Sequence, residues 1–263
     1  MSRLKHYLSI YGKFVATSFS VNMSFRTSFV LLIIMDIFFY LSTLFTVDFL
    51  FDHISTLGPW NREQLMFFIS FMLVIDNLHM AILSESFWVL ARQIKTGDID
   101  FILLKPVHSI FTIFFRYARP SSLINAILTW SVLIYFGIQI SLSPLSWFLL
   151  PFLVLLSFTL LSILEILIST SMFWMQEGLG INFLRMQLQQ LSRWPEYIYS
   201  NIPKRIFLIG FPMLLVGSGP VHILIDHNQW PFLIALIFAI IIFMIILLKI
   251  WRVALLHYES ASS

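Results

Sequence analysis

The chain has 263 residues, of which 59% are hydrophobic and 11% are charged, and its mean hydropathy is +0.90. This composition excludes an ordinary soluble domain and indicates an integral membrane protein with several spans. The net charge of +3 does not indicate nucleic-acid binding, because the basic residues lie between apolar segments, and the absence of cysteine excludes disulfides and thiolate chemistry within this chain.

Residues 1–24 are predicted to form an amphipathic helix that lies in the membrane interface. Apolar residues recur at helical spacing, and polar residues such as Lys5 and Lys13 fall on the opposite side. A cleavable signal is excluded, because the segment lacks a continuous apolar core and a small-residue cleavage site. The alternative for this segment is a frayed tail. The apolar positions are Leu4, Leu8, Tyr11, Val15 and Phe19.

Six segments are apolar enough, at roughly 20 residues each, to cross a membrane as helices. With the N-terminus placed in the cytoplasm, every Lys and Arg except Arg62 falls on the cytoplasmic side, as the positive-inside rule requires. Both termini are therefore predicted to be cytoplasmic, and the long cytoplasmic loops 92–120 and 175–205 to face a partner. The chain is predicted to form one domain over 1–263, with spans at 27–51, 65–91, 123–140, 147–174, 206–225 and 231–248.

Three acidic residues fall inside these spans, where an unpaired charge is costly. They are Asp36 in the first span, Asp76 in the second and Glu165 in the fourth. Two roles are open for each: hydrogen bonding to neighbouring helices, which fixes the packing, or a direct part in a translocation path. The polar neighbours on the same helix face are Tyr40 and Thr43 for Asp36, His79 for Asp76, and Thr159, Ser162 and Ser169 for Glu165.

The fifth apolar segment contains glycines and prolines that a regular lipid-exposed helix would avoid. A broken or re-entrant segment near the outer face is therefore expected, and a kinked helix is the alternative. These residues are Gly210, Pro212, Gly217, Gly219 and Pro220.

The stretch "GDIDFILLKPV", residues 97–107, has the features of a short capped helix between two spans. Gly97 is suited to end the preceding helix, and Asp98 is a good N-cap. Asp98 and Asp100 complement the positive N-terminal pole, Lys105 complements the negative C-terminal pole, and Pro106 stops the helix. We predict a helix of about two turns, too short to span a membrane.

The predicted helix has an apolar surface made by Phe101, Ile102, Leu103 and Leu104. Such a surface suits insertion into a groove on a cytoplasmic partner. A helix lying on the membrane surface is the alternative.

Signatures of catalysis are weak in this sequence. The Gly12-Lys13 pair lacks the upstream glycine of a nucleotide-binding loop, and there is no H-E-x-x-H motif. His222 and Asp226 form an isolated pair near a loop, which is weak evidence for an acyltransferase. We expect no enzymatic activity, no metal site and no cofactor in this chain.

The stretch at 97–107 resembles the first cytoplasmic loop of permease subunits of type-2 ATP-binding-cassette (ABC) exporters, in a bacterial export branch. The resemblance extends to the interfacial N-terminal helix, the six spans and the aromatic-proline stretch "SRWPEYIY" at 192–199. It implies a dimer of permeases, often of two related chains, with two cytoplasmic ABC ATPase subunits that bind the ATP. The loop after the second span would then hold the coupling helix, with coupling residues Gly97, Asp98, Asp100, Phe101, Leu104, Lys105 and Pro106.

The resemblance also implies an outer gate at the end of the fifth span. Members of the family tend to have an aromatic-proline pair there, whereas this chain has Gly219-Pro220. Gly217, Gly219 and Pro220 are the corresponding gate candidates.

These observations predict an all-α integral membrane protein with six transmembrane helices, an N-terminal interfacial amphipathic helix and a short cytoplasmic coupling helix. The predicted function is that of a permease subunit in the bacterial cytoplasmic (inner) membrane. It would export a hydrophobic or amphiphilic substrate, in contact with membrane lipid, using ATP hydrolysed by a separate chain. The alternative is an ion-coupled secondary transporter in which Asp36, Asp76 and Glu165 carry protons.

Overall fold

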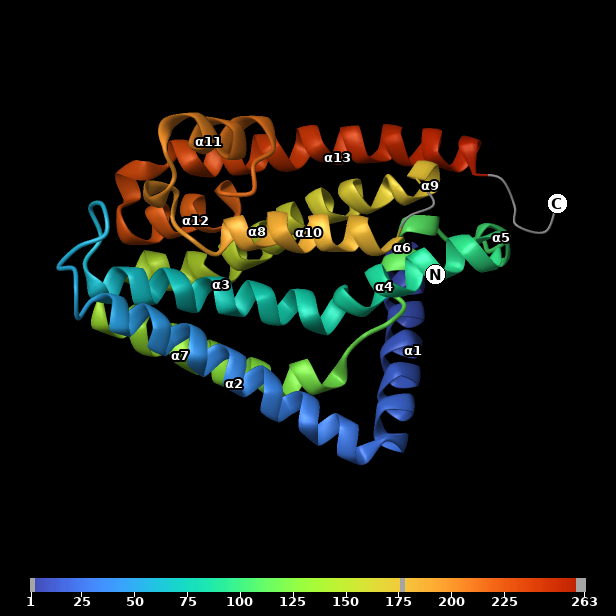
Figure 1. Cartoon of the computed structure of the whole chain (residues 1–263), viewed down its shortest axis with the longest axis horizontal. Coiled ribbons are helices and arrows are strands. Elements are labelled where there is room, and N and C mark those ends of the chain that lie inside the picture. Colours follow the sequence, from blue (N-terminus) through green and yellow to red (C-terminus); the bar gives the residue numbers. More distant parts are fainter. Residues whose placement is uncertain (1–2, 176–177, 259–263) are drawn as a thin grey trace.

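The computed structural model describes residues 3–175 and 178–258, and this part of the chain is helical without any β-strand. Long helices lie side by side, and the start of the first helix and the end of the last one lie at the same end of the bundle (Figure 1). We call this the terminal end and the opposite one the distal end. The prediction of an all-α membrane protein is confirmed.

In the described part of the chain, five helices are long and apolar enough to cross a membrane, or six if the bent pair at 201–225 counts as one span. They are α2 (Arg26–Leu50), α3 (Arg62–Ile82), α7 (Pro120–Gln139), α8 (Pro144–Thr170), which continues through α9 (Met172–Met175), and α13 (Pro231–His257), which follows η3 (His227–Gln229). Single long helices thus cover four of the six predicted segments: 27–51, 123–140, 147–174 and 231–248.

The starts of these helices follow from local sequence. At α3, Asn61 and Gln64 form a reciprocal capping box, which satisfies two backbone N–H groups that have no partner inside the helix. Helices α7, α8 and α13 each have proline in the first turn, where the missing N–H costs no hydrogen bond. At α8, the Ser143 hydroxyl also accepts a hydrogen bond from the Ser146 N–H.

The second predicted span is broken. Helix α3 ends at Ile82, and α4 (Ser84–Thr96) begins after Leu83, so the single helix expected over 65–91 is wrong. The break is stabilised from outside, because the backbone N–H of Arg119 donates to the carbonyl of Ala81 at 2.9 Å. A carbonyl that the interrupted helix leaves open is thereby paired.

Helix α10 (Gly178–Ser192) runs from the terminal end back towards the distal end, along α8 and α4 (Figure 1). It is followed by η1 (Glu196–Ile198), and the Tyr197 ring lies 5.4 Å from the ring of Trp60 in the distal loop. The Lys204 Nζ in turn lies 5.0 Å from the Tyr197 ring centroid. The sequence-based expectation that loop 175–205 lies on the same side as loop 92–120 agrees with the start of α10 but is wrong for the part around Tyr197.

The fifth predicted segment is strongly bent. Residues Asn201–Gly210, which comprise α11 (Asn201–Arg205) and the π-helical η2 (Ile206–Gly210), meet α12 (Leu215–Ile225) at 92°. This agrees with a broken or re-entrant segment at the distal end, and it excludes a straight or merely kinked helix over 206–225.

Helix α1 (Arg3–Ser24) lies across the terminal end of the bundle (Figure 1). Its Tyr7 ring packs edge-on against Phe111 at 4.9 Å, and its Ser18 hydroxyl accepts a hydrogen bond from the Ala118 N–H. The predicted apolar residues Leu4, Leu8 and Phe19 point away from the protein and are exposed. They are therefore available to lipid, as an interfacial helix requires.

Candidate functional site

The short helix predicted in the loop after the second span is present at the terminal end, as α5 (Asp98–Leu103). Gly97 ends α4 in the left-handed conformation, with φ of 77°, which glycine adopts without steric cost. Ile99 and Ile102 are buried against the protein. Phe101 and Leu104 lie on the other side, with 71% and 82% of their surface exposed.

Two details of α5 differ from the sequence-based expectation. Gly97, and not Asp98, occupies the N-cap position, and the Asp98 carboxylate accepts a hydrogen bond from the Thr96 hydroxyl at 2.8 Å. The helix ends at Leu103, so Lys105 and Pro106 lie beyond it. The observed helix has six residues and is shorter than the predicted one.

The C-terminal end of α13 lies near α5. Tyr258 packs edge-on against Phe173, and burial, together with Asp98 and Asp100 nearby, raises the pKa of the Tyr258 phenol. Asp100, predicted as a coupling residue, thus belongs to the contact that links α5 to the last helix.

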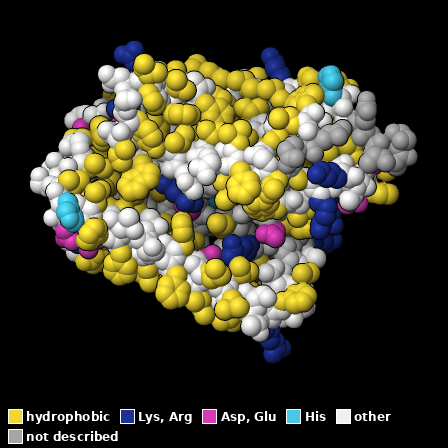
Figure 2. Space-filling model, viewed as in Figure 1, with side chains coloured by type: hydrophobic (Ala, Val, Ile, Leu, Met, Phe, Trp, Pro, Cys, Tyr) yellow, Lys and Arg dark blue, Asp and Glu magenta, His cyan; other side chains and the backbone are white. Residues whose placement is uncertain are grey.

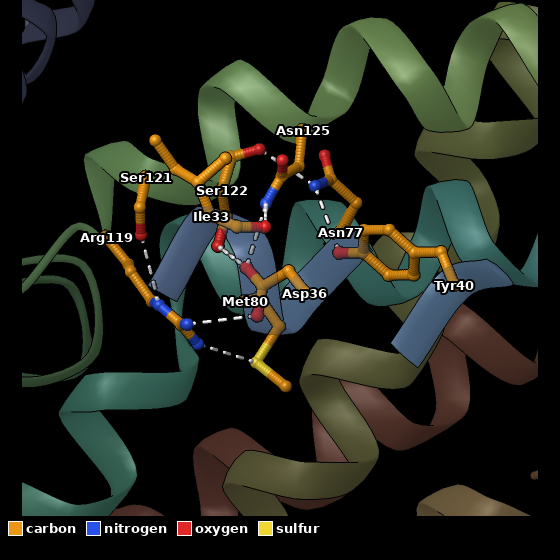
Figure 3. A network of polar contacts seen from close by, with 9 residues as sticks. All are labelled: Ile33, Asp36, Tyr40, Asn77, Met80, Arg119, Ser121, Ser122 and Asn125. Carbon is orange, nitrogen blue, oxygen red and sulfur yellow. Dashed lines mark hydrogen bonds and ion pairs between the residues drawn. The ribbon is translucent and has the colours of Figure 1, made fainter. Parts of the chain in front are cut away.

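Asp36, on α2, lies in a network of polar contacts with the start of α7 (Figure 3). Arg119 Nη2 donates to Asp36 Oδ1 at 3.0 Å, and the side chains of Ser122 and Asn125 donate to Asp36 Oδ2 at 3.3 and 3.2 Å. Next to this network, the amide of Asn77 on α3 donates to the backbone carbonyl of Ser122 at 2.8 Å. Asp36 therefore joins α2 to α7.

Asp76, on α3, is buried and pairs with α10 and the residue that follows it. Gln189 Nε2 donates to Asp76 Oδ1 at 3.2 Å, and Arg193 Nε lies 2.8 Å from Asp76 Oδ2. The guanidinium of Arg193 also lies 5.2 Å from the ring centroid of Phe39 on α2. These contacts tie three helices together at one carboxylate.

Glu165, on α8, is fully buried. Arg185 Nη1 donates to Glu165 Oε1 at 3.0 Å, and His79 Nε2 lies 2.5 Å from Glu165 Oε2. The Arg185 guanidinium stacks 4.2 Å above the Phe87 ring, which is also stacked against the His79 ring. Ser162 and Ser169 share the buried face with Glu165, as the helical spacing predicted.

The partners of these acids border one cavity of about 420 Å³ between α2, α3, α4 and α10. Figure 2 shows charged side chains in a hollow on this face, surrounded by hydrophobic ones. Such a cavity offers both charges and apolar walls to a ligand. The lining side chains are Asp36, Phe39, Tyr40, Asp76, His79, Met80, Ser84, Glu85, Trp88, Arg119, Arg185, Met186, Gln189, Gln190 and Arg193.

The sequence analysis identified the three acids but not their cationic partners. Arg119, Arg185 and Arg193 were assigned to cytoplasmic loops, although they pair with acids in three different helices. The spacing of Arg185, Gln189 and Arg193 at four-residue intervals places them on one helix face, and this was a signal that could have revealed them.

The gate candidates lie on α12 at the distal end, and all three are buried. A Cβ atom on Gly217 would lie 2.7 Å from the sulfur of Met72, so glycine permits close packing of α12 on α3. Nearby, Glu196 pairs with His222 at 2.8 Å. Although burial alone would raise it, hydrogen bonds from His222 and Ser218 hold the pKa of the Glu196 carboxyl below its ordinary value.

The described residues contain no cluster of three or more potential metal-ligating side chains. The apolar helices, the charged cavity between them and the exposed helix at one end are features of the multi-pass membrane proteins that move solutes.

The sequence model of the family described as "ABC-2 family transporter protein" matches residues 30–262. The chain therefore belongs to this family, which supplies the membrane permease of ABC transporters and implies an ATP-binding-cassette ATPase as partner. Comparison with curated proteins and with solved structures gave no match.

Proposed function

We propose that the chain is the permease subunit of an exporter in the bacterial cytoplasmic membrane, driven by ATP that a separate cytoplasmic subunit hydrolyses. The observation that carries this proposal is α5, whose apolar residues Phe101 and Leu104 are exposed at the terminal end of the bundle. The substrate class that suits the cavity is hydrophobic or amphiphilic.

The geometry of α5 supports a role in force transmission. Ile99 and Ile102 fix the helix to the protein, while Phe101 and Leu104, three residues apart, project together. A helix that is anchored on one side and apolar on the other fits a groove on a partner and moves with the spans to which it is attached. In this proposal the terminal end of the bundle is cytoplasmic.

The charged cavity is the proposed part of the translocation path within this chain. Its arginines and carboxylates offer contacts to the polar part of a substrate. Phe39, Met80 and Trp88 offer contacts to the apolar part. Helix α2 borders this cavity, and only 11% of its most apolar stretch is buried. This large apolar face suits a second permease chain, which would close the path in a dimer.

The test is Phe101→Asp, with Phe101→Leu as the matched control. The aspartate places a charge in the proposed contact and is expected to cost about 2 kcal/mol or more of binding free energy, a loss of about thirtyfold in affinity. We expect loss of co-purification with the ATPase and of substrate-stimulated hydrolysis, while Phe101→Leu retains both. Full retention of both by a folded Phe101→Asp protein would rule out α5 as the docking element.

A second candidate function is ion-coupled transport. Glu165, fully buried between His79 and Arg185, is the observation that favours it, because buried acid–histidine pairs occur in proton relays. The two functions differ in energy source. Transport that stops with a catalytically inactive ATPase but continues with an uncoupler identifies the exporter, and the reverse result identifies the ion-coupled transporter.

A further inference from the structure

A second cavity, of about 620 Å³, lies at the terminal end between α1, α4 and the segment that follows α5. Four basic side chains line it: Lys13 from α1, Arg92 from α4, and Lys105 and Arg116 from the following segment. Among the described lining residues, Glu85 is the one carboxylate. The cavity thus collects positive charge from parts of the chain that are far apart in sequence.

These four basic residues form no ion pair within the described part of the chain. The contrast with the first cavity is direct, because there Arg119, Arg185 and Arg193 each pair with a carboxylate. Bringing like charges together raises their electrostatic energy, and an anion bound among them lowers it. The cavity is therefore electrostatically suited to an anionic ligand.

The remaining lining residues define the ligand further. Thr17 and Tyr117 supply hydroxyl groups, and the Tyr117 hydroxyl already accepts a hydrogen bond from Gln93, so its hydrogen is free to be donated. Phe14, Val21 and Val89 supply apolar wall. Basic and hydroxyl groups suit a phosphate, while apolar walls suit the first carbons of an acyl chain.

The position of the cavity agrees with such an amphiphilic anion. Its α1 wall belongs to a helix that exposes Leu4, Leu8 and Phe19 away from the protein, as a helix does when it lies in the membrane interface. Figure 2 shows Lys and Arg side chains gathered over this end of the molecule. Basic cavities at the cytoplasmic membrane surface are where the phosphates of anionic lipids bind.

We infer that this cavity binds the phosphate head group of an anionic phospholipid, held by Lys13, Arg92, Lys105 and Arg116. Arg92 lies on the helix that ends at Gly97, and Lys105 follows α5 by two residues. A bound head group therefore connects α1 to both sides of α5 and restrains the orientation of that helix. The inference rests on the proposed function only for the cytoplasmic position of the terminal end, because it requires lipid binding and not transport.

The test is lipid binding to the full-length chain in detergent, with phosphatidylglycerol and phosphatidylcholine as probes. Native mass spectrometry gives the affinity, and the thermal midpoint gives the stabilisation. We expect phosphatidylglycerol to bind and stabilise more strongly. In the double variant Arg92→Gln/Arg116→Gln, the affinity for phosphatidylglycerol should fall about 25-fold. Each basic residue near a membrane surface contributes about 1 kcal/mol, or about fivefold in affinity, and two of them are removed.

The control is Lys95→Gln/Arg252→Gln, which removes the same net charge from exposed residues at the same end that do not line the cavity. Its affinity for phosphatidylglycerol should stay within about twofold of the unmodified chain, since long-range charge is screened by salt. An equal loss in both double variants would overturn the inference. So would equal binding of the two lipids, or equal stabilisation by inorganic phosphate at the same concentration. Unchanged thermal midpoints in phosphatidylcholine confirm that both variants are folded.

Discussion

The charged cavity and α5 are opposite cases of side chains in unfavourable surroundings. In and beside the cavity, Asp36, Asp76 and Glu165 lie among membrane helices, but each has a basic partner from another part of the chain. On α5, Phe101 and Leu104 are exposed, and no apolar residue of the described chain covers them. The buried carboxylates are neutralised within the protein, so their pairs affect folding. The exposed apolar side chains of α5 are left for a partner to cover, so they affect assembly.

The largest effect that this comparison predicts is on stability, from breaking the buried pair. Arg185→Met leaves Glu165 buried opposite His79 alone, and loss of one partner of a buried pair costs about 3–5 kcal/mol. We expect a matching decrease in the free energy of unfolding, measured by denaturant titration in detergent. The double variant Glu165→Leu/Arg185→Met should recover most of the loss, because it removes both charges.

The exposed pair Arg62 and Asp48 provides the control for that experiment. Its side chains are 50% and 41% exposed, so Arg62→Met should cost less than about 1 kcal/mol. If Arg185→Met and Arg62→Met destabilised the protein equally, the distinction between compensated interior charges and surface charges would be wrong.

An intermediate effect is expected at the joint between α4 and α5. Gly97→Val places a β-branched residue in the left-handed conformation, which costs about 1–2 kcal/mol for residues with a Cβ atom. We expect reduced ATPase co-purification through misorientation of α5, with little change in the spans, whose integrity is measured by circular dichroism. Gly97→Asn is the matched control, because asparagine adopts this conformation more readily than other non-glycine residues. Equal behaviour of both variants would show that the left-handed turn does not position α5.

The smallest effect is expected at Asp98. An N-cap aspartate contributes about 1 kcal/mol, but the Asp98 carboxylate bonds the Thr96 hydroxyl and caps no backbone N–H. Asp98→Ala should therefore change stability by less than about 0.5 kcal/mol, as ordinary surface substitutions do. Thr96→Val removes the same hydrogen bond from the other side and should have a similarly small effect. A loss of about 1 kcal/mol for Asp98→Ala alone would restore the capping role.

The sequence was sufficient for features that depend on neighbouring residues. Hydrophobic runs located the long helices, and Gly97 located the end of α4, because a glycine after a helical pattern commonly adopts the left-handed conformation. The cap of α5 was misplaced by one residue. Gly97 and Asp98 both suit that position, so the residue types alone do not choose between them, and the structure has Gly97 there.

Features that depend on residues far apart in the chain could not be predicted from the sequence. Helix α10 contains Asn182, Arg185 and Gln189, so its hydropathy resembles that of a loop. These residues are buried because Asp76, Glu165 and the carbonyl of Phe87 pair with them. A single sequence shows which polar residues require partners but not which residues supply them.

The pairing of Asp36 with Arg119 has a consequence for biogenesis. The two residues are 83 positions apart, and α2, which holds Asp36, is synthesised before Arg119. At a synthesis rate of about 5–20 residues per second, roughly 4 to 17 s pass before Arg119 is made. During this interval the nascent α2 lacks the cationic partner of Asp36, and a carboxylate without a partner is costly in hydrocarbon. A product truncated before Arg119 would lack this partner permanently, so its α2 would be less stable in the membrane.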